Sequence, residues 1–145
     1  AHPHDIPVTG IVELACLAAR VLSCGLWLTV GLYKIAHFET SAEDMAQHGI
    51  PYARAVLPLV LILLLGGSAL VIADLYVWAV SLAWIAFLVP ASLIYHGRFI
   101  TADRSIDFFQ LVLFWKNVSM MGGLLALVLL DPTRPAWLLR GSAMG

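Results

Sequence analysis

The residues best suited to chemistry are polar or charged side chains that interrupt long apolar stretches. Lys116 and Asn117 lie side by side in the stretch 108–130, a few residues from its middle. A lysine within a membrane costs roughly 2.5–3.5 kcal/mol on insertion scales. We therefore expect Lys116 to face other helices or a polar cavity, or to reach the membrane interface by snorkelling. We also expect the other apolar stretches to pack around this one.

A second charged site is predicted in the stretch 11–32, which contains Glu13 and Arg20. Residues three and four positions apart share one face of a helix. On that face lie Glu13, Cys16, Arg20, Ser23 and Trp27. Glu13 is a candidate ion-pair partner for Arg20, at a rise of about 10.5 Å along the axis. The alternative is that Arg20 binds an anion, a quinone or a substrate head group.

The candidate cofactor is a quinone, because a quinone site needs an apolar slot and hydrogen-bond donors at the carbonyls. Arg20, Lys116, Asn117 and His96 could donate, and Trp27 could line the slot. No intrinsic electron carrier is expected, since the sequence has no CxxC pair, no pair of intramembrane histidines suited to haem and no dinucleotide fingerprint. No metal site is predicted either.

The composition places these residues in a membrane protein. The chain has 145 residues, of which 61% are hydrophobic and 12% charged, and its mean hydropathy is +0.92. A soluble domain of this length would be less apolar. The net charge is −1 and no basic run is present, so a nucleic-acid partner is not expected. The predicted partners are the lipid bilayer and other membrane or redox proteins.

Four predicted spans organise the chain, at about 11–32, 55–73, 75–95 and 108–130. The predicted fold is an all-α integral membrane four-helix bundle, with residues 1–145 forming one domain. A short interfacial helix should lie between the first two spans, capped by Thr40 or Ser41 and ended by Gly49. Gly66 and Gly67 should allow a neighbouring helix to approach closely. A multi-pass location in a membrane follows from this plan.

The order of several motifs resembles that of the DoxX family of small membrane proteins. The features that carry the resemblance are Arg20, Gly31 with Lys34, the segment from Met45 to Pro51, Gly66-Gly67, the segment 96–99 and Lys116-Asn117 with Gly122-Gly123. One departure is that apolar residues stand where the family often has a glutamate, just before Gly66. The resemblance implies a multi-pass protein of the cell's inner membrane, and a membrane component linked to quinone, sulfur or thiol redox chemistry.

Three functions remain open at this stage. The first is an accessory subunit of a redox assembly that includes a quinone site. The second is a structural subunit that stabilises a larger membrane complex without redox chemistry. The third is a small carrier, for which four spans would need to oligomerise. Whether the chain catalyses a reaction by itself stays open.

Overall fold

Helices dominate the computed structural model, which describes residues 8–100 and 105–138. The α-helices are α1 (Val8–Ala36), α2 (Phe38–Gln47), α3 (Ala53–Leu61), α4 (Gly67–Ile72), α5 (Val77–His96) and α6 (Phe108–Leu130). A π turn, η1 (Ile62–Gly66), joins α3 to α4, and a 3-10 turn, η2 (Ala136–Leu138), follows α6. The predicted all-α fold with a short helix between the first two spans is confirmed.

Four helical segments are long and apolar enough to cross a membrane. They are Gly10–Ala36, Ala53–Ile72, Val77–His96 and Phe108–Leu130. The last of these has the predicted limits, because Asp107 and Asp131 bound a continuous apolar run. The first extends beyond the predicted end at residue 32, since the helix continues through the more polar turn around Lys34.

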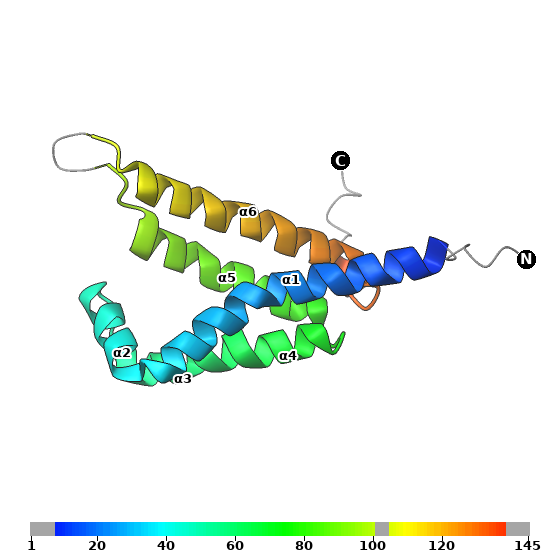
Figure 1. Ribbon diagram of the computed structural model, residues 1–145, viewed down its shortest axis with the longest axis horizontal. Helices are drawn as coiled ribbons and strands as arrows, with labels where there is room; N and C mark the ends of the chain where they lie inside the picture. Colours follow the sequence, from blue (N-terminus) through cyan, green and yellow to red (C-terminus); the bar gives the residue numbers. More distant parts are fainter. Residues whose placement is uncertain (1–7, 101–104, 139–145) are drawn as a thin grey trace, which may run out of the picture.

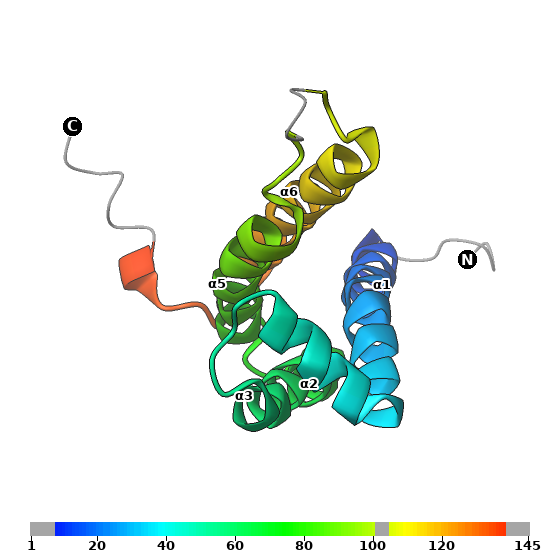
Figure 2. The ribbon, with the colours of Figure 1, turned by 90° about the vertical axis from the view of Figure 1, so that its left-hand side faces the viewer.

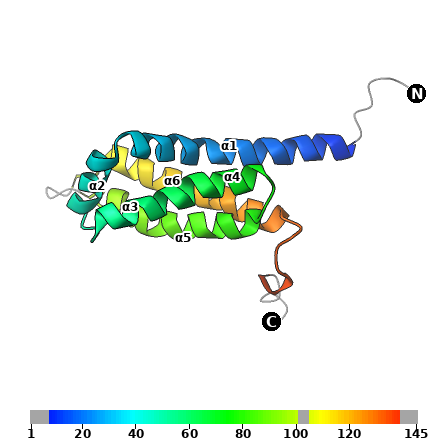
Figure 3. The same cartoon turned by 90° about the horizontal axis from the view of Figure 1, so that it is seen from below.

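The spans run along the long axis of the molecule, with a distinct set of connections at each end (Figure 1). One end holds the start of α1, the α4–α5 turn and the end of α6, and is called the terminal side. The other end holds α2 and the α5–α6 connection, and is called the loop side. Seen from below, α2 turns across the loop-side end of the bundle next to α3 (Figure 3).

The helix α5 lies at the centre of the packing, between α6 and the span formed by α3, η1 and α4. The side chain of Trp84 in α5 is fully buried and stacks on Trp27 of α1, with ring centroids 4.8 Å apart. The indole N–H of Trp84 donates to the Leu63 carbonyl in the π turn at 3.1 Å. The expectation that the other spans surround α6 is therefore wrong: α6 packs chiefly on α5, at one edge of the bundle.

Two glycines set the closest helix approaches. A Cβ built on Gly67 would lie 3.0 Å from Val80 and 3.1 Å from Trp84, so the predicted close approach at this position is confirmed. A Cβ on Gly31 of α1 would lie 2.6 Å from Leu65 of the π turn. These glycines let α1 and α5 each pack closely against the second span.

The helix α2 starts earlier than predicted. It begins at Phe38, with His37 as its N-cap, and no side chain caps it. The predicted caps Thr40 and Ser41 are wrong because the chain continues almost directly from α1, and the backbone N–H of Ser41 already bonds the His37 carbonyl. The predicted end is confirmed, since Gly49 follows α2 with a φ of +82°, a conformation that favours glycine.

Candidate functional site

The largest polar cavity lies at the loop side and is called the loop-side cavity. It has a volume of about 780 Å³ and is formed by the end of α2, the end of α5 and the start of α6. Its polar lining residues are Gln47, His48, Tyr95, Arg98, Asp107 and Gln110. This combination of histidine, phenol, guanidinium, amide and carboxylate groups can both donate and accept hydrogen bonds.

The ring of His48 is oriented by the backbone of α2. Its Nδ1 lies 2.9 Å from the backbone carbonyl of Asp44. A carbonyl oxygen only accepts, so Nδ1 carries the proton in the neutral ring and Nε2 is left with a free lone pair. The Asp44 carboxylate lies 3.4 Å from the same Nδ1. His48 can therefore accept a hydrogen bond at Nε2.

Tyr95 forms the wall behind His48. The two rings stack with centroids 4.2 Å apart and an interplanar angle of 27°. The hydroxyl oxygen of Tyr95 is buried and has no partner in hydrogen-bond geometry within the described chain. The Asp44 carboxylate is near enough to act on it electrostatically and as a weak hydrogen-bond acceptor. A ligand in the cavity would therefore have to compete with Asp44 for this hydroxyl.

The floor of the cavity is fixed by contacts between α5 and α6. Nδ1 of His96 lies 2.8 Å from Oε1 of Gln110, which ties the end of α5 to the first turn of α6. Asp107 caps α6 by accepting a hydrogen bond from the Gln110 N–H at 3.1 Å. Arg98 is exposed, lines the cavity and forms no ion pair with the described residues.

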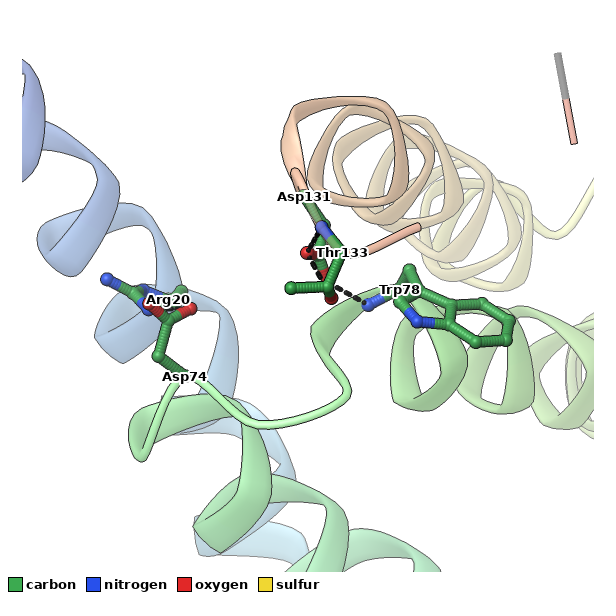
Figure 4. Close-up of polar contacts among 5 residues, drawn as sticks. All are labelled: Arg20, Asp74, Trp78, Asp131 and Thr133. Carbon is green, nitrogen blue, oxygen red and sulfur yellow. Dashed lines mark hydrogen bonds and ion pairs between the residues drawn. The ribbon is translucent and has the colours of Figure 1, made fainter. Parts of the chain in front are cut away.

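A smaller cavity lies at the terminal side, between α1 and α6, and is called the terminal-side cavity. Its volume is about 250 Å³, and Glu13, Arg20, Asp74 and Asp131 contribute to its lining. The guanidinium of Arg20 forms an ion pair with Asp74 in the α4–α5 turn (Figure 4). The predicted Glu13–Arg20 pair is therefore corrected: the α4–α5 turn brings Asp74 to Arg20, while Glu13 stays exposed and makes no ion pair with described residues.

Asp131 organises the terminal side, a role that its position after an apolar stretch does not predict. Its Oδ2 accepts a hydrogen bond from the Trp78 N–H at 2.9 Å, and its Oδ1 accepts two from Thr133 at 2.7 and 2.8 Å (Figure 4). Burial tends to raise the pKa of this carboxyl, but these hydrogen bonds and the charge of Arg134 outweigh burial and lower it. In the sequence, this role of Asp131 is indicated only by the Asp-Pro-Thr segment that follows the last span.

The five predicted ligand-binding residues do not converge on one site. Arg20 lies in the terminal-side cavity, His96 lies beside the loop-side cavity and Trp27 is buried in the core. Asn117 is buried and donates from Nδ2 to the Ser92 hydroxyl at 3.0 Å, so it joins α6 to α5. Lys116 points out of the bundle and is exposed.

The described residues contain no group of three or more histidine, cysteine or acidic side chains that could hold a metal ion. Both cysteines are free thiols: Cys24 is buried, and its Sγ lies 3.7 Å from the Ser68 carbonyl, while Cys16 is half-buried.

Comparison with known proteins assigns the family. The DoxX profile matches residues 15–97, which is more than half of the chain. The chain belongs to the DoxX family. The matched region of this DoxX protein includes the segments around His48 and Tyr95 that meet at the loop-side cavity, and it ends before α6.

A curated relative supports the membrane location. The chain is 27% identical over 120 residues to the inner membrane protein YqjF of Escherichia coli (strain K12), an alignment that covers 83% of this chain and 86% of the relative. Together with four helices able to span a membrane, this confirms the predicted multi-pass location in the inner membrane. No solved structure gives a significant match to this chain.

Proposed function

We propose that this DoxX protein is an accessory membrane subunit of a quinone-linked or thiol-linked redox assembly, and that it holds a quinone head group in the loop-side cavity. The observation that carries the proposal is the stacked pair of His48 and Tyr95 in the wall of a polar cavity of about 780 Å³. That volume falls within the range of about 300–1,000 Å³ typical of small-molecule sites.

The residues of the cavity suit a quinone. Its carbonyl oxygens accept hydrogen bonds, and Tyr95, Arg98 and Gln110 carry donors that line the cavity. A bound quinone would supply two-electron redox chemistry, while His48 could accept a hydrogen bond at Nε2 beside it. The loop-side position is also appropriate, because the end of a span lies at the membrane interface. There the polar head group of a quinone can lie above its apolar tail.

Two arguments support the accessory role: the family, and the electron-carrying groups that the described residues could form. None of their side chains forms a cluster suited to a metal, and the two cysteines lie too far apart on one helix to form a disulfide with each other. The protein would thus bind and position a redox partner's substrate, and the partner would supply the electron transfer.

The test is photolabelling of the purified full-length protein in nanodiscs with an azidoquinone. His48→Ala removes the stacked ring and should reduce labelling, and Tyr95→Phe should weaken quinone binding about 2- to 13-fold, as expected for one hydrogen bond of 0.5–1.5 kcal/mol. The label should map to the ends of α2 and α5.

A matched control exists in the same chain. His37 stacks on Tyr33 with centroids 4.3 Å apart, and its Nδ1 lies 3.1 Å from the Tyr33 carbonyl, yet neither residue lines the loop-side cavity. His37→Ala should leave labelling unchanged. Labelling that is equally strong in the His48→Ala and Tyr95→Phe variants, or that maps elsewhere, would contradict the proposal.

A structural subunit without redox chemistry is the second candidate, and the buried Asn117–Ser92 bond favours it, because this polar pair is fully used in joining two helices. In that case the protein would co-purify with a larger complex but would not take up the quinone label.

A further inference from the structure

Lys116 is a charged residue within the last span for which the described chain supplies no partner. Lys116 lies eight residues after the start of α6, is exposed, and forms no hydrogen bond or ion pair in the part of the chain that the structure describes. Its neighbour Asn117 faces α5, so Lys116, turned about 100° around the helix, faces away from it. An unpaired ammonium group in this position is unfavourable in lipid.

The surface around Lys116 is suited to contact with another helix. Along the same face, at three- and four-residue spacing, follow Ser119, Gly123 and Ala126, all of them exposed. A Cβ built on Gly123 meets no atom within 4 Å. Small residues allow two membrane helices to approach closely, so this face offers both a charge and a flat surface.

The position of α6 leaves this face open. The helix packs extensively on α5 alone, and α1 and α6 approach each other at the terminal side but diverge toward the loop side (Figures 1 and 2). Lys116 lies in the loop-side half of α6, where no helix of the described chain covers it.

We propose that this face of α6 docks a transmembrane helix of another protein that carries an aspartate or glutamate at the depth of Lys116. The argument is charge complementarity: a carboxylate in the same apolar environment neutralises the ammonium group and is itself neutralised. This inference rests on the accessory role proposed above and specifies the chemistry of the partner.

A second copy of this chain does not supply that carboxylate. Copies inserted in the same orientation place equal residues at equal depths. The nearest acidic residue along α6 is Asp107, nine positions before Lys116, a rise of about 13.5 Å. Glu13 lies near the terminal-side end of α1, and Asp131 follows the terminal-side end of α6. None of these three carboxylates lies at the depth of Lys116.

The experiment measures association in liposomes between the labelled full-length protein and a synthetic transmembrane helix of leucine and alanine. The helix carries one glutamate at the depth of Lys116, and a matched helix carries glutamine. By energy transfer, the glutamate helix should associate about 5- to 30-fold more tightly with the wild-type protein. Lys116→Met should abolish this preference, and Lys116→Glu should instead prefer a helix that carries lysine.

Lys34 provides the control, because it is the other lysine of the chain, lies on α1 and also lacks a partner among described residues. Lys34→Met should leave the preference for glutamate unchanged. The measurements use vesicles of phosphatidylcholine, alone and mixed with phosphatidylglycerol. Equal association of the glutamate and glutamine helices in both compositions would show that Lys116 does not select a carboxylate, and would overturn the proposal.

Self-association is measured on the same samples without added helix. Energy transfer between copies that disappears in Lys116→Met would identify a second copy as the occupant, and would also overturn the proposal. Quinone labelling of the same preparations is independent of this surface. A failure of the docking inference can therefore be told apart from a failure of the quinone site.

Discussion

Asp131 illustrates how one side chain can connect distant parts of a membrane protein. Its carboxylate accepts the Trp78 N–H, which belongs to the first turn of α5 and has no partner within that helix. It also accepts two hydrogen bonds from Thr133. One buried carboxylate therefore joins the start of α5, the end of α6 and the segment that follows.

The lowered pKa of Asp131 predicts a pH dependence of stability. In the folded state the pKa lies below its ordinary value of 3.8, so the unfolded chain binds a proton more readily. The contribution of Asp131 is fully present above the unfolded value and is lost as the pH falls through the folded value. The melting temperature in detergent should therefore fall at acid pH, a decrease called the acid limb. Asp131→Asn should make this decrease smaller.

Removing the carboxylate should also cost stability at neutral pH. Asp131→Ala leaves the Trp78 N–H without its acceptor, and the expected loss is about 1.5–3 kcal/mol in the free energy of unfolding, as for hydrogen bonds to a charged group. An unchanged melting temperature for this variant, or an acid limb that persists in Asp131→Asn, would show that Asp131 is not the cause.

At the residue scale, the sequence identifies the polar side chains within the spans that need a partner. It does not identify which residue each of them contacts. The polar pair Lys116-Asn117 is visible in the sequence, but which member faces inward depends on how α6 is rotated against α5. Arg20 was correctly expected to need a partner, yet the partner is Asp74 rather than Glu13. Such a pair depends on how two spans pack, which the spacing along one helix does not determine.

At the scale of elements, the buried contact between the second span and α5 depends on a glycine, Gly67, which has no side chain. Gly67 is buried against Val80 and Trp84. Trp84 cannot easily move away, because its ring stacks on Trp27 and its N–H is bonded to the Leu63 carbonyl. The close packing of three spans is therefore held around one indole ring.

Gly67→Ala should destabilise the protein by about 1–3 kcal/mol, since the added methyl group would lie 3.0–3.2 Å from fixed neighbours. Gly122 provides a matched control on α6, because a Cβ there meets nothing within 4 Å. Gly122→Ala should be neutral, or stabilising by up to about 1 kcal/mol through helix propensity. Equal effects of the two substitutions on chemical unfolding would contradict this account.

The elements themselves were largely predictable. The limits 108–130 were correct because charged residues bound an apolar run on both sides. The start of α2 was not, because α2 follows α1 almost directly: the His37 N–H bonds to the Tyr33 carbonyl of α1, and the Ser41 N–H bonds to the His37 carbonyl. The π turn at Ile62–Gly66 lies within a uniformly apolar sequence, so no residue type marked it.

At the scale of the whole molecule, the two ends of the bundle differ in charge. Among the described residues, Lys34, Arg54 and Arg98 lie near the loop-side end of the bundle, against Arg134 beyond the terminal-side end. From this excess of basic residues the positive-inside rule predicts that the loop side faces the cytoplasm. The loop-side cavity would open toward cytoplasmic partners.

This orientation can be tested by cysteine labelling in a Cys16→Ala background, because Cys24 is buried. Gln47→Cys on the loop side and Ala136→Cys on the terminal side are both at exposed positions. A membrane-impermeant maleimide added to intact cells should label the cysteine at position 136 and not the one at position 47, and inverted vesicles should reverse the pattern. The opposite result in cells would place the cavity outside the cytoplasm.

The bond between Trp78 and Asp131 also has a consequence for biosynthesis. Translation proceeds from the N-terminus, so α5 enters the membrane before its Trp78 N–H has an acceptor. The first turn of α5 can reach its final state only when the residues after α6 have left the ribosome. The native terminal side is then assembled last, and a nascent chain halted within α6 should remain open to insertion factors and proteases there.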